Sequence, residues 1–319
     1  MDTVPRKFVD SVVELFDGEE TLDPLAEEVT HPLWKAVVDF HQRNRVYYDI
    51  YIRETENSLQ LAAQKYGTEI YEDFELIRKN RRFARILQID YETDEGSESR
   101  WKNVKSLEEV DLAKRLESVA PQFQQNSSLF TSDLDCQKTI LSSLSSLFFG
   151  EIWLHYNGQT SFTFLEKQIT HSSFLELINL HEGDDRWPMS VLPLLEQFCL
   201  KGRPGRRVFL DIGDPLEAKI DKNFMEKIFD LWKNNGALNF SIECNLKTVD
   251  SEDRLTLFNK GQVIQRHEFR RFFRHDTAKS IAVCYSEDYY EEFLEFHTCE
   301  CDVSTECYLK ERYPEFHDF

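Results

Sequence analysis

The fold is decided by the stretch VFLDIGDPLEAKIDKNFMEKIFDLWKNNGALNFSIEC, residues 208–244. Apolar side chains recur at every second position in its first five and its last five residues, as they do in half-buried strands. Between them, residues 222–232 place apolar side chains at helical spacing, with Asp221 as a candidate N-cap and Asn234-Asn235-Gly236 as a stop. A strand, a helix and a second strand in this order predict a β-α unit whose two strands are parallel.

The same unit recurs along the C-terminal half of the chain. Strand-like runs centre on Leu177, Leu210, Ile242 and Val283, at near-regular intervals of which the last is the longest. We predict that these residues are consecutive buried rungs of one parallel sheet. Such repetition is typical of an open, curved β-α repeat with leucine-rich-repeat-like parallel strands, which offers a face to another macromolecule. A doubly wound α/β sheet is the alternative, although no strand is followed by the Gly-rich turn of a nucleotide site.

Length and charge bound the classes of domain and partner. The 319 residues predict a helical block at 1–50, a β-α repeat interaction domain at 51–296 and a cysteine-containing acidic tail at 297–319. The net charge is −20, with 58 acidic and 38 basic residues spread along the chain. Such a field repels phosphate groups, so nucleic acid and anionic membrane surfaces are disfavoured as partners.

The sequence contains none of the common signals for a membrane span, for targeting or for hydrolytic catalysis. No run approaches the ~20 apolar residues of a membrane span, and residues 1–7 resemble neither a signal peptide nor a transit peptide. The seven cysteines fit a reduced protein of the cytoplasm or the nucleus. The strings Gly-x-Ser-x-Gly, Gly-x4-Gly-Lys-Ser/Thr and His-Glu-x2-His are absent. We therefore expect a non-catalytic binding protein that uses no cofactor.

The first 45 residues carry a resemblance to a known family. Val4-Pro5 precedes an amphipathic helix, and His31-Pro32-Leu33-Trp34 opens a second helix. The further apolar positions of the two helices are Phe8, Val12, Val13, Leu15, Val37 and Val38. These strings resemble the Leu-Pro-led first helix and the later helix of an F-box, although the segment between them, residues 17–28, is acidic and not Leu-rich. The chain is similar to nematode F-box-like proteins, and its segment Phe229-Asp230-Leu231-Trp232-Lys233-Asn234-Asn235-Gly236 resembles their C-terminal region.

The resemblance implies a substrate-recognition subunit of an SCF-type ubiquitin ligase. In that role the box binds a Skp1-type linker protein through an apolar helix face, and the rest of the chain binds a protein substrate of unknown identity. The residues implied on the linker-binding face are Val4, Pro5, Phe8, Val12, Leu15 and Trp34. Two alternatives stay open. One is that the N-terminal block is a simple cap on the repeats. The other is that the chain is an interaction or regulatory protein with no link to a ligase.

One segment, from Arg266 to His275, interleaves basic and aromatic residues. Its composition suits RNA or phosphate recognition, so an RNA-binding module is a further alternative. Phe269, Phe272 and Phe273 fall at helical spacing, which predicts an amphipathic element whose arginines pair with carboxylates of the chain. We expect an electropositive rim here for an acidic or phosphorylated partner, beside a polar strand face. The rim residues are Arg207, Arg270, Arg271 and Arg274, and the polar strand positions are Asp211, Asn239, Ser241 and Glu243.

The C-terminal tail contains Cys299, Cys301, Cys307 and His317 at short spacing. Thiolates and an imidazole in such proximity could hold zinc tetrahedrally. The Cys-x-Cys spacing lacks the Cys-x2-Cys knuckle of common structural zinc sites, which favours ordinary reduced cysteines in a frayed tail. The sequence therefore predicts no metal site.

Overall fold

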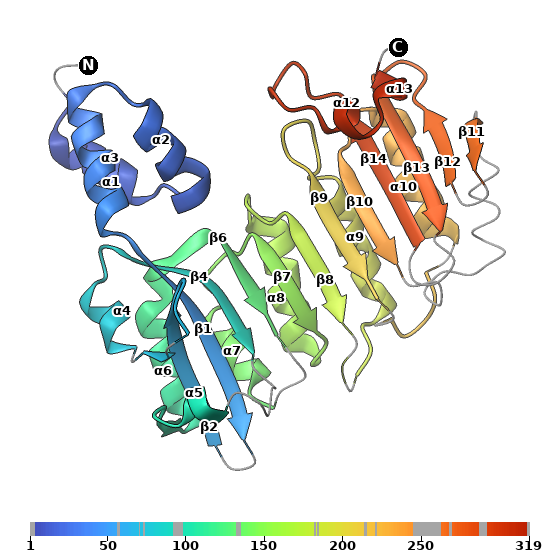
Figure 1. Ribbon diagram of the computed structural model, residues 1–319. Helices are drawn as coiled ribbons and strands as arrows, with labels where there is room; N and C mark the ends of the chain where they lie inside the picture. The colour runs from blue at the N-terminus through green and yellow to red at the C-terminus, as the bar shows by residue number, and fades with distance from the viewer. Residues whose placement is uncertain are drawn as a thin grey trace. The chain divides into compact units, whose positions relative to one another are not determined.

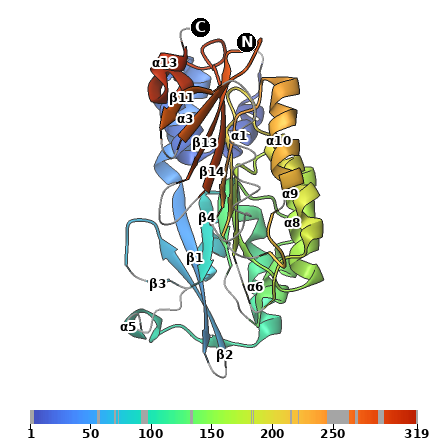
Figure 2. The same ribbon diagram turned by 90° about the vertical axis from the view of Figure 1, so that its right-hand side faces the viewer.

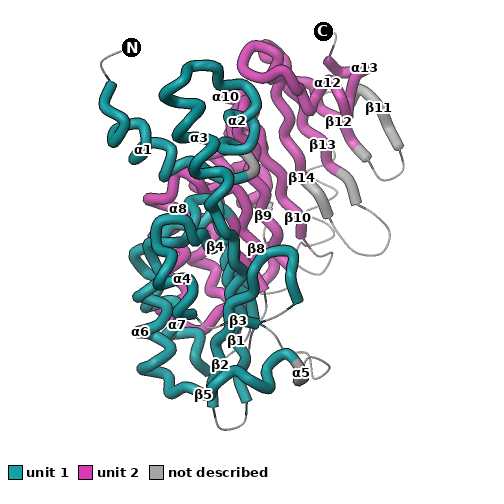
Figure 3. The backbone as a smooth tube through the Cα atoms, turned by 60° about the vertical axis from the view of Figure 1, so that its left-hand side comes forward, with its two compact units in different colours: residues 1–150 teal, residues 151–319 magenta. Residues whose placement is uncertain are grey.

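A computed structural model gives the fold of the chain in two compact units, residues 1–150 and 151–319 (Figure 3). This division differs from the predicted boundaries at residues 50 and 296. The structure describes residues 4–55, 58–69, 71–72, 74–91, 98–131, 135–181, 183, 185–213, 216–220, 222–244, 263–267, 270–286 and 292–317.

The first unit opens with a helical block. It consists of α1 (Arg6–Glu14), a π-helical turn (Gly18–Leu22), α2 (Asp23–Glu28) and α3 (Pro32–Asn44). The two predicted helices are confirmed, and the acidic segment between them is helical as well. The block has a core of its own, made of Val9, Val13, Leu22, Ala26, Val37 and Val38.

Two buried arginines join this block to the strands that follow it. Arg45 donates to the backbone carbonyls of Val13 (2.8 Å) and Glu14 (3.1 Å), and Arg85 donates to the carbonyl of Glu14 (3.0 Å). These carbonyls belong to the end of α1, where a helix has no internal donors left. The guanidinium groups therefore supply a C-terminal cap from outside the helix.

The sheet of the first unit is built around β1 (Val46–Thr55). It runs in the order β6-β4-β1-β2-β3, with β5 paired to β2. The strands β4 (Ala84–Tyr91) and β6 (Phe123–Phe130) continue the parallel side, while β2 (Ser58–Lys65) returns antiparallel to β1. The shorter strands are β3 (Tyr71–Glu72) and β5 (Ser106–Leu107), and the helices are α4 (Glu75–Lys79), α5 (Glu98–Trp101), α6 (Glu109–Val119) and α7 (Gln137–Ser143). The apolar spacing from Arg53 to Asn80 predicts mostly helix, which is correct for α4 and wrong for residues 58–65. Those residues form β2 because they find hydrogen-bond partners along β1, and tertiary pairing overrides local propensity.

The second unit begins with the predicted β-α units. The strands β7 (Glu151–His155), β8 (Leu177–His181), β9 (Val208–Ile212) and β10 (Phe240–Cys244) are parallel and lie in chain order. Their crossover helices are α8 (Gln159–His171), α9 (Leu192–Cys199) and α10 (Lys222–Asn235). Figures 1 and 2 show these helices on one face of the strands. The α/β class is confirmed. The parallel strands β7 to β10 follow one another in the sheet in the order of the chain, whereas the strand order of a doubly wound sheet reverses at one point.

The second half of this sheet is antiparallel. Next to β10 lie β14 (Glu292–Thr298), β13 (Ser280–Ser286), β12 (Arg270–Arg274) and β11 (Val263–His267), in that order. Leu210 and Ile242 are paired as predicted, but the partner of Leu210 on β8 is Ile178 and not Leu177. The fourth rung is wrong, since Val283 lies on β13, which is antiparallel to β14 and separated by it from β10. Alternation of apolar residues reports that a strand is half-buried, and it does not report direction or neighbours.

The segment 266–275, predicted as an amphipathic element with helical spacing, instead belongs to an antiparallel pair of strands, β11 and β12. Phe269, one of the predicted positions, lies outside the described residues. Adjacent residues of a strand point to opposite faces of a sheet. Phe272 therefore packs with Phe316 on one face, and Phe273 packs with Phe229 of α10 on the other. In the sequence, the adjacent Phe272 and Phe273 resemble the apolar face of a helix, although in the structure they lie on opposite faces of a strand.

The C-terminal tail is folded. Its helices α12 (Tyr308–Arg312) and α13 (Pro314–His317) lie on the sheet face opposite α10 (Figure 2). They share one apolar cluster with β12 and β13, made of Phe272, Ile281, Val283, Cys307, Leu309, Tyr313 and Phe316. The expectation of a frayed tail is wrong because Tyr313 and Phe316 bury large rings in this cluster.

Candidate functional site

An apolar stripe on α1 is open to solvent. Phe8 is 56% exposed and Leu15, the C-cap residue directly after α1, is 71% exposed, while Val12 between them is half-buried. Positions i, i+4 and i+7 lie on one side of a helix. The opposite side of α1 buries Val9 and Val13 in the core of the block. These three residues, the α1 stripe, therefore form an apolar face that the block's own core does not use.

The other residues predicted on this face have different places. Val4 and Trp34 pack against the core of the helical block. Pro5 is exposed and is the N-cap residue of α1, with its carbonyl accepting from the backbone N–H of Phe8 at 2.9 Å. The structure thus brings Phe8, Val12 and Leu15 together and assigns Val4 and Trp34 to internal packing.

A second candidate surface is the strand face of the second unit that α8, α9 and α10 leave uncovered. On this face Trp153 stacks near His181 (ring centroids 5.4 Å apart), and His181 stacks on His155 (5.0 Å). Asn179, on the same strand as His181, donates from Nδ2 to Oδ2 of Asp211 on β9 at 2.6 Å. We call Trp153, His155, Asn179, His181 and Asp211 the strand-face cluster.

His181 of this cluster is biased toward the neutral form. Burial is the larger cause that lowers the pKa of His181 below its usual 6.5, and the nearby His155 lowers it further. A neutral imidazole beside an indole ring gives a surface that offers stacking area together with a single donor and a single acceptor. Such a mixture suits a polypeptide better than a phosphate backbone.

Sequence reasoning did not single out Trp153, His155 and His181. A signal was present, because Trp153 and His155 alternate with the buried Ile152 and Leu154 in one strand. The missing information was the register, which places His155 opposite His181 on the neighbouring strand.

The predicted electropositive rim is largely used inside the fold. Arg207 donates to Oγ of Ser241 (2.6 Å) and lies 3.4 Å from a carboxylate oxygen of Glu295. The ring of Tyr308 covers its guanidinium at 4.2 Å. Asn239, another predicted surface position, is buried and donates to Glu300 at 2.9 Å. This part of the polar strand face is thus covered by residues of the C-terminal segment.

The remaining rim residues lie on β12. Arg274 is exposed and Arg271 is half-buried, and both have interactions within the chain. Arg270 is described by its backbone, which pairs with Tyr285 of β13. The arginines therefore sit on a strand of the sheet and not on a projecting insert.

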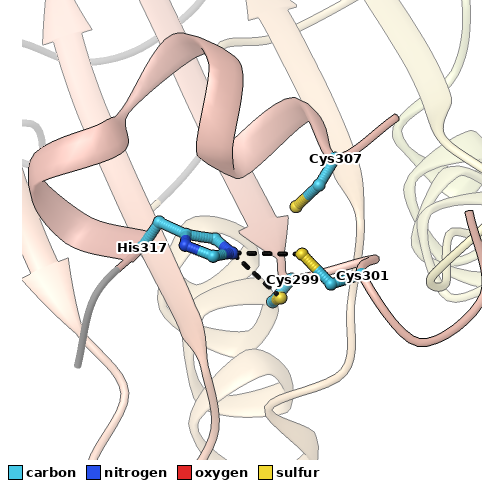
Figure 4. Close-up of side chains that lie close together, drawn as sticks. All are labelled: Cys299, Cys301, Cys307 and His317. Carbon is cyan, nitrogen blue, oxygen red and sulfur yellow. Dashed lines mark hydrogen bonds between the residues drawn. The ribbon is translucent and has the colours of Figure 1, made fainter. Parts of the chain in front are cut away.

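The predicted absence of a metal site meets an unexpected geometry. Cys299 follows β14, Cys301 lies in the next turn, Cys307 precedes α12, and His317 ends α13. Their sulfur and nitrogen ligand atoms all lie within 4.8 Å of one another. Nε2 of His317 is 3.5 Å from Sγ of Cys299 and 3.2 Å from Sγ of Cys301, as Figure 4 shows.

The fold of the turn explains how Cys-x-Cys spacing brings the thiols together. The backbone N–H groups of Val303 and Ser304 both donate to the carbonyl of Glu300 at 2.9 Å. This turn reverses the chain directly after Cys301 and returns Cys307 to the end of β14. The backbone N–H of Glu300 then donates to Sγ of Cys307 at 3.3 Å.

Scans against protein-family models, curated proteins and solved structures gave no match to this chain. Among the described residues, no helix combines the length and the apolar character that crossing a membrane requires. The α1 stripe and the strand-face cluster are therefore the features of the structure that bear on its function.

Proposed function

We propose that this protein is a non-catalytic interaction adaptor that serves as a substrate-recognition subunit of an SCF-type ubiquitin ligase. In this role the α1 stripe binds a Skp1-type linker protein. The strand-face cluster of the second unit holds the protein substrate. The chain contributes binding surfaces, and the ligase machinery contributes the chemistry.

The observation that carries the proposal is the exposure of Phe8 and Leu15 on a helix whose opposite side is well packed. Large apolar side chains that recur at i, i+4 and i+7 are the anchors by which a helix lies in a partner's groove. A helix with a complete core on one side does not need these residues for its own stability. The F-box-like string that begins at Val4-Pro5 leads into the same helix, whereas the string around Trp34 opens α3.

The strand face supports the second half of the proposal. Parallel strands with helices on one face leave the other face for recognition, as in β-α repeat proteins. Trp153 supplies a large ring at the centre of the strand-face cluster, and aromatic residues are the commonest anchors of protein interfaces. Asp211, held in place by the hydrogen bond from the buried Asn179, adds a polar group that would fix the orientation of a bound polypeptide.

The test is affinity capture of a purified Skp1-type protein by the full chain. Phe8→Asp and Leu15→Asp place a charge in the groove contact and should each lower capture at least tenfold. The matched control is Val110→Asp, because Val110 is 64% exposed on α6 and lies outside the α1 stripe. Melting temperatures of all variants should stay near that of the unchanged protein, since none of these side chains is buried.

Two results would contradict the adaptor role. Absence of capture by the unchanged protein would remove the ligase link and leave an interaction protein of another kind. Equal capture by Leu15→Asp and Val110→Asp would show that the α1 stripe is not the docking face.

A further inference from the structure

The Cys/His cluster, made of Cys299, Cys301, Cys307 and His317, has the composition of a closed metal site. Three thiols and one imidazole are the Cys3His set of structural zinc sites. Sulfur ligands select Zn²⁺ over Mg²⁺ and Ca²⁺, which prefer oxygen. With four protein ligands, no coordination position would remain for water or a substrate, so such an ion would have a structural role.

The distances fit a tetrahedral ion. Zinc bonds of about 2.3 Å to sulfur and about 2.0–2.1 Å to nitrogen give ligand-to-ligand separations of roughly 3.6–3.8 Å in a tetrahedron. The separations from Nε2 of His317 to Cys299 (3.5 Å) and to Cys301 (3.2 Å) lie near this range. The largest separation in the cluster, 4.8 Å at most, exceeds it by about 1 Å, which small side-chain rotations can close.

One hydrogen bond within the cluster favours a thiolate. The backbone N–H of Glu300 donates to Sγ of Cys307 at 3.3 Å. Hydrogen bonds from backbone amides to sulfur stabilise the anionic form that a metal requires. The cysteines are free thiols in the structure, so no disulfide competes for them.

We propose that Cys299, Cys301, Cys307 and His317 bind one structural zinc ion that locks the C-terminal segment onto the sheet. On binding, each thiol that is still protonated releases its proton, and the ion is held by three thiolates and Nε2 of His317. The inference does not depend on the adaptor function.

The need for such a lock follows from the size of α12 and α13. They contain five and four residues, and helices this short are not stable alone in water. Their apolar contacts to Phe272, Ile281 and Val283 help to hold them, and the ion would close the segment into a loop fixed at the end of β14. Because Tyr308 of α12 covers Arg207, the same ion would keep this part of the strand face covered.

The first experiment measures metal in the full chain, purified without chelator. Native mass spectrometry and elemental analysis should find one zinc per chain. Cys301→Ala should lose it, whereas Cys136→Ala should retain it, because Cys136 is a free thiol of the first unit outside the cluster. Cys301 is exposed, so its replacement cannot unfold the protein by opening a cavity.

A second experiment keeps the proposal testable if a variant folds poorly. Cobalt exchanged into the unchanged protein should show the intense visible bands of tetrahedral Co²⁺ and a thiolate-to-metal charge-transfer band. Chelation should speed amide hydrogen exchange in residues 308–317 at least tenfold and leave β8 and β9 unchanged. Absence of both bound zinc and the cobalt spectrum, or a disulfide between any two of these cysteines in the freshly purified protein, would overturn the proposal.

Discussion

Replacing Leu210 with Ala tests whether the parallel strands form one packed layer. Leu210 is fully buried at the centre of β9, between Ile178 on β8 and Ile242 on β10, which are also fully buried. Removing three carbon groups loses roughly 2.4 kcal/mol of transfer free energy at about 0.8 kcal/mol for each group. Hydrogen bonds to strands on both sides prevent β9 from moving into the space, so a cavity cost adds to this loss. We expect a total of about 3–5 kcal/mol, in the upper part of the range for Leu→Ala.

The assay is equilibrium urea unfolding, followed by tryptophan fluorescence of the buried Trp187 and Trp232 in the same unit. The transition midpoint should fall with little change in slope, since the exposed surface on unfolding is nearly the same. The matched control is Leu200→Ala, the same chemical change at a side chain that is 42% exposed, and it should cost less than about 0.5 kcal/mol. A cost for Leu210→Ala no larger than that of the control would refute the buried rung.

Three further predictions concern single contacts. Burial, with a smaller contribution from Asp90, raises the pKa of Asp49 to about 6, so ionisation of Asp49 opposes folding and stability falls as the pH rises from about 4 to 6. Asp49→Asn should therefore raise the melting temperature at pH 7.5 and leave it unchanged at pH 4. The gain at pH 7.5 should correspond to about 1 kcal/mol after solvent screening. Tyr313→Phe removes a buried hydrogen bond of 2.9 Å to Glu295 and should cost about 1.5–3 kcal/mol in urea unfolding, whereas Tyr308→Phe, whose hydroxyl accepts from the exposed Arg312, should cost much less. Gly202→Ala would press a methyl group onto the carbonyl of Asn239 and should cost about 1–3 kcal/mol by the same assay; an unchanged midpoint would show that this backbone approach is looser than described.

The periodicity of apolar residues was enough to predict individual helices and strands. The strands at Val208–Ile212 and Phe240–Cys244 were expected, and so was the helix between them, which was predicted over residues 222–232 and extends to Asn235. The parallel pairing of the two strands followed from this helix. The helices at either end of the N-terminal block were expected for the same reason. Each has strong apolar periodicity and a Pro at or before its first turn.

Pairing between distant strands was beyond the sequence. Nothing in the alternation of Val283 shows that β14 separates β13 from β10, because the decision is made by hydrogen bonds between residues far apart in the chain. The Cys/His cluster is a similar case. Its ligand atoms meet because α12 and α13 pack on β12 and β13, whereas spacing alone indicated free thiols.

The two arginines that cap α1 have a practical consequence for domain mapping. Deleting residues 1–50 would cut through β1, the strand that both β2 and β4 pair with, and would remove Arg45. It would also take away the Glu14 carbonyl that Arg85 binds, which leaves a buried cation short of an acceptor in the remaining fragment. A shortened chain that fails to capture a partner would then report a damaged sheet as readily as a missing contact. Point substitutions on the solvent side of α1 avoid this ambiguity, because they leave the cap and the strand intact.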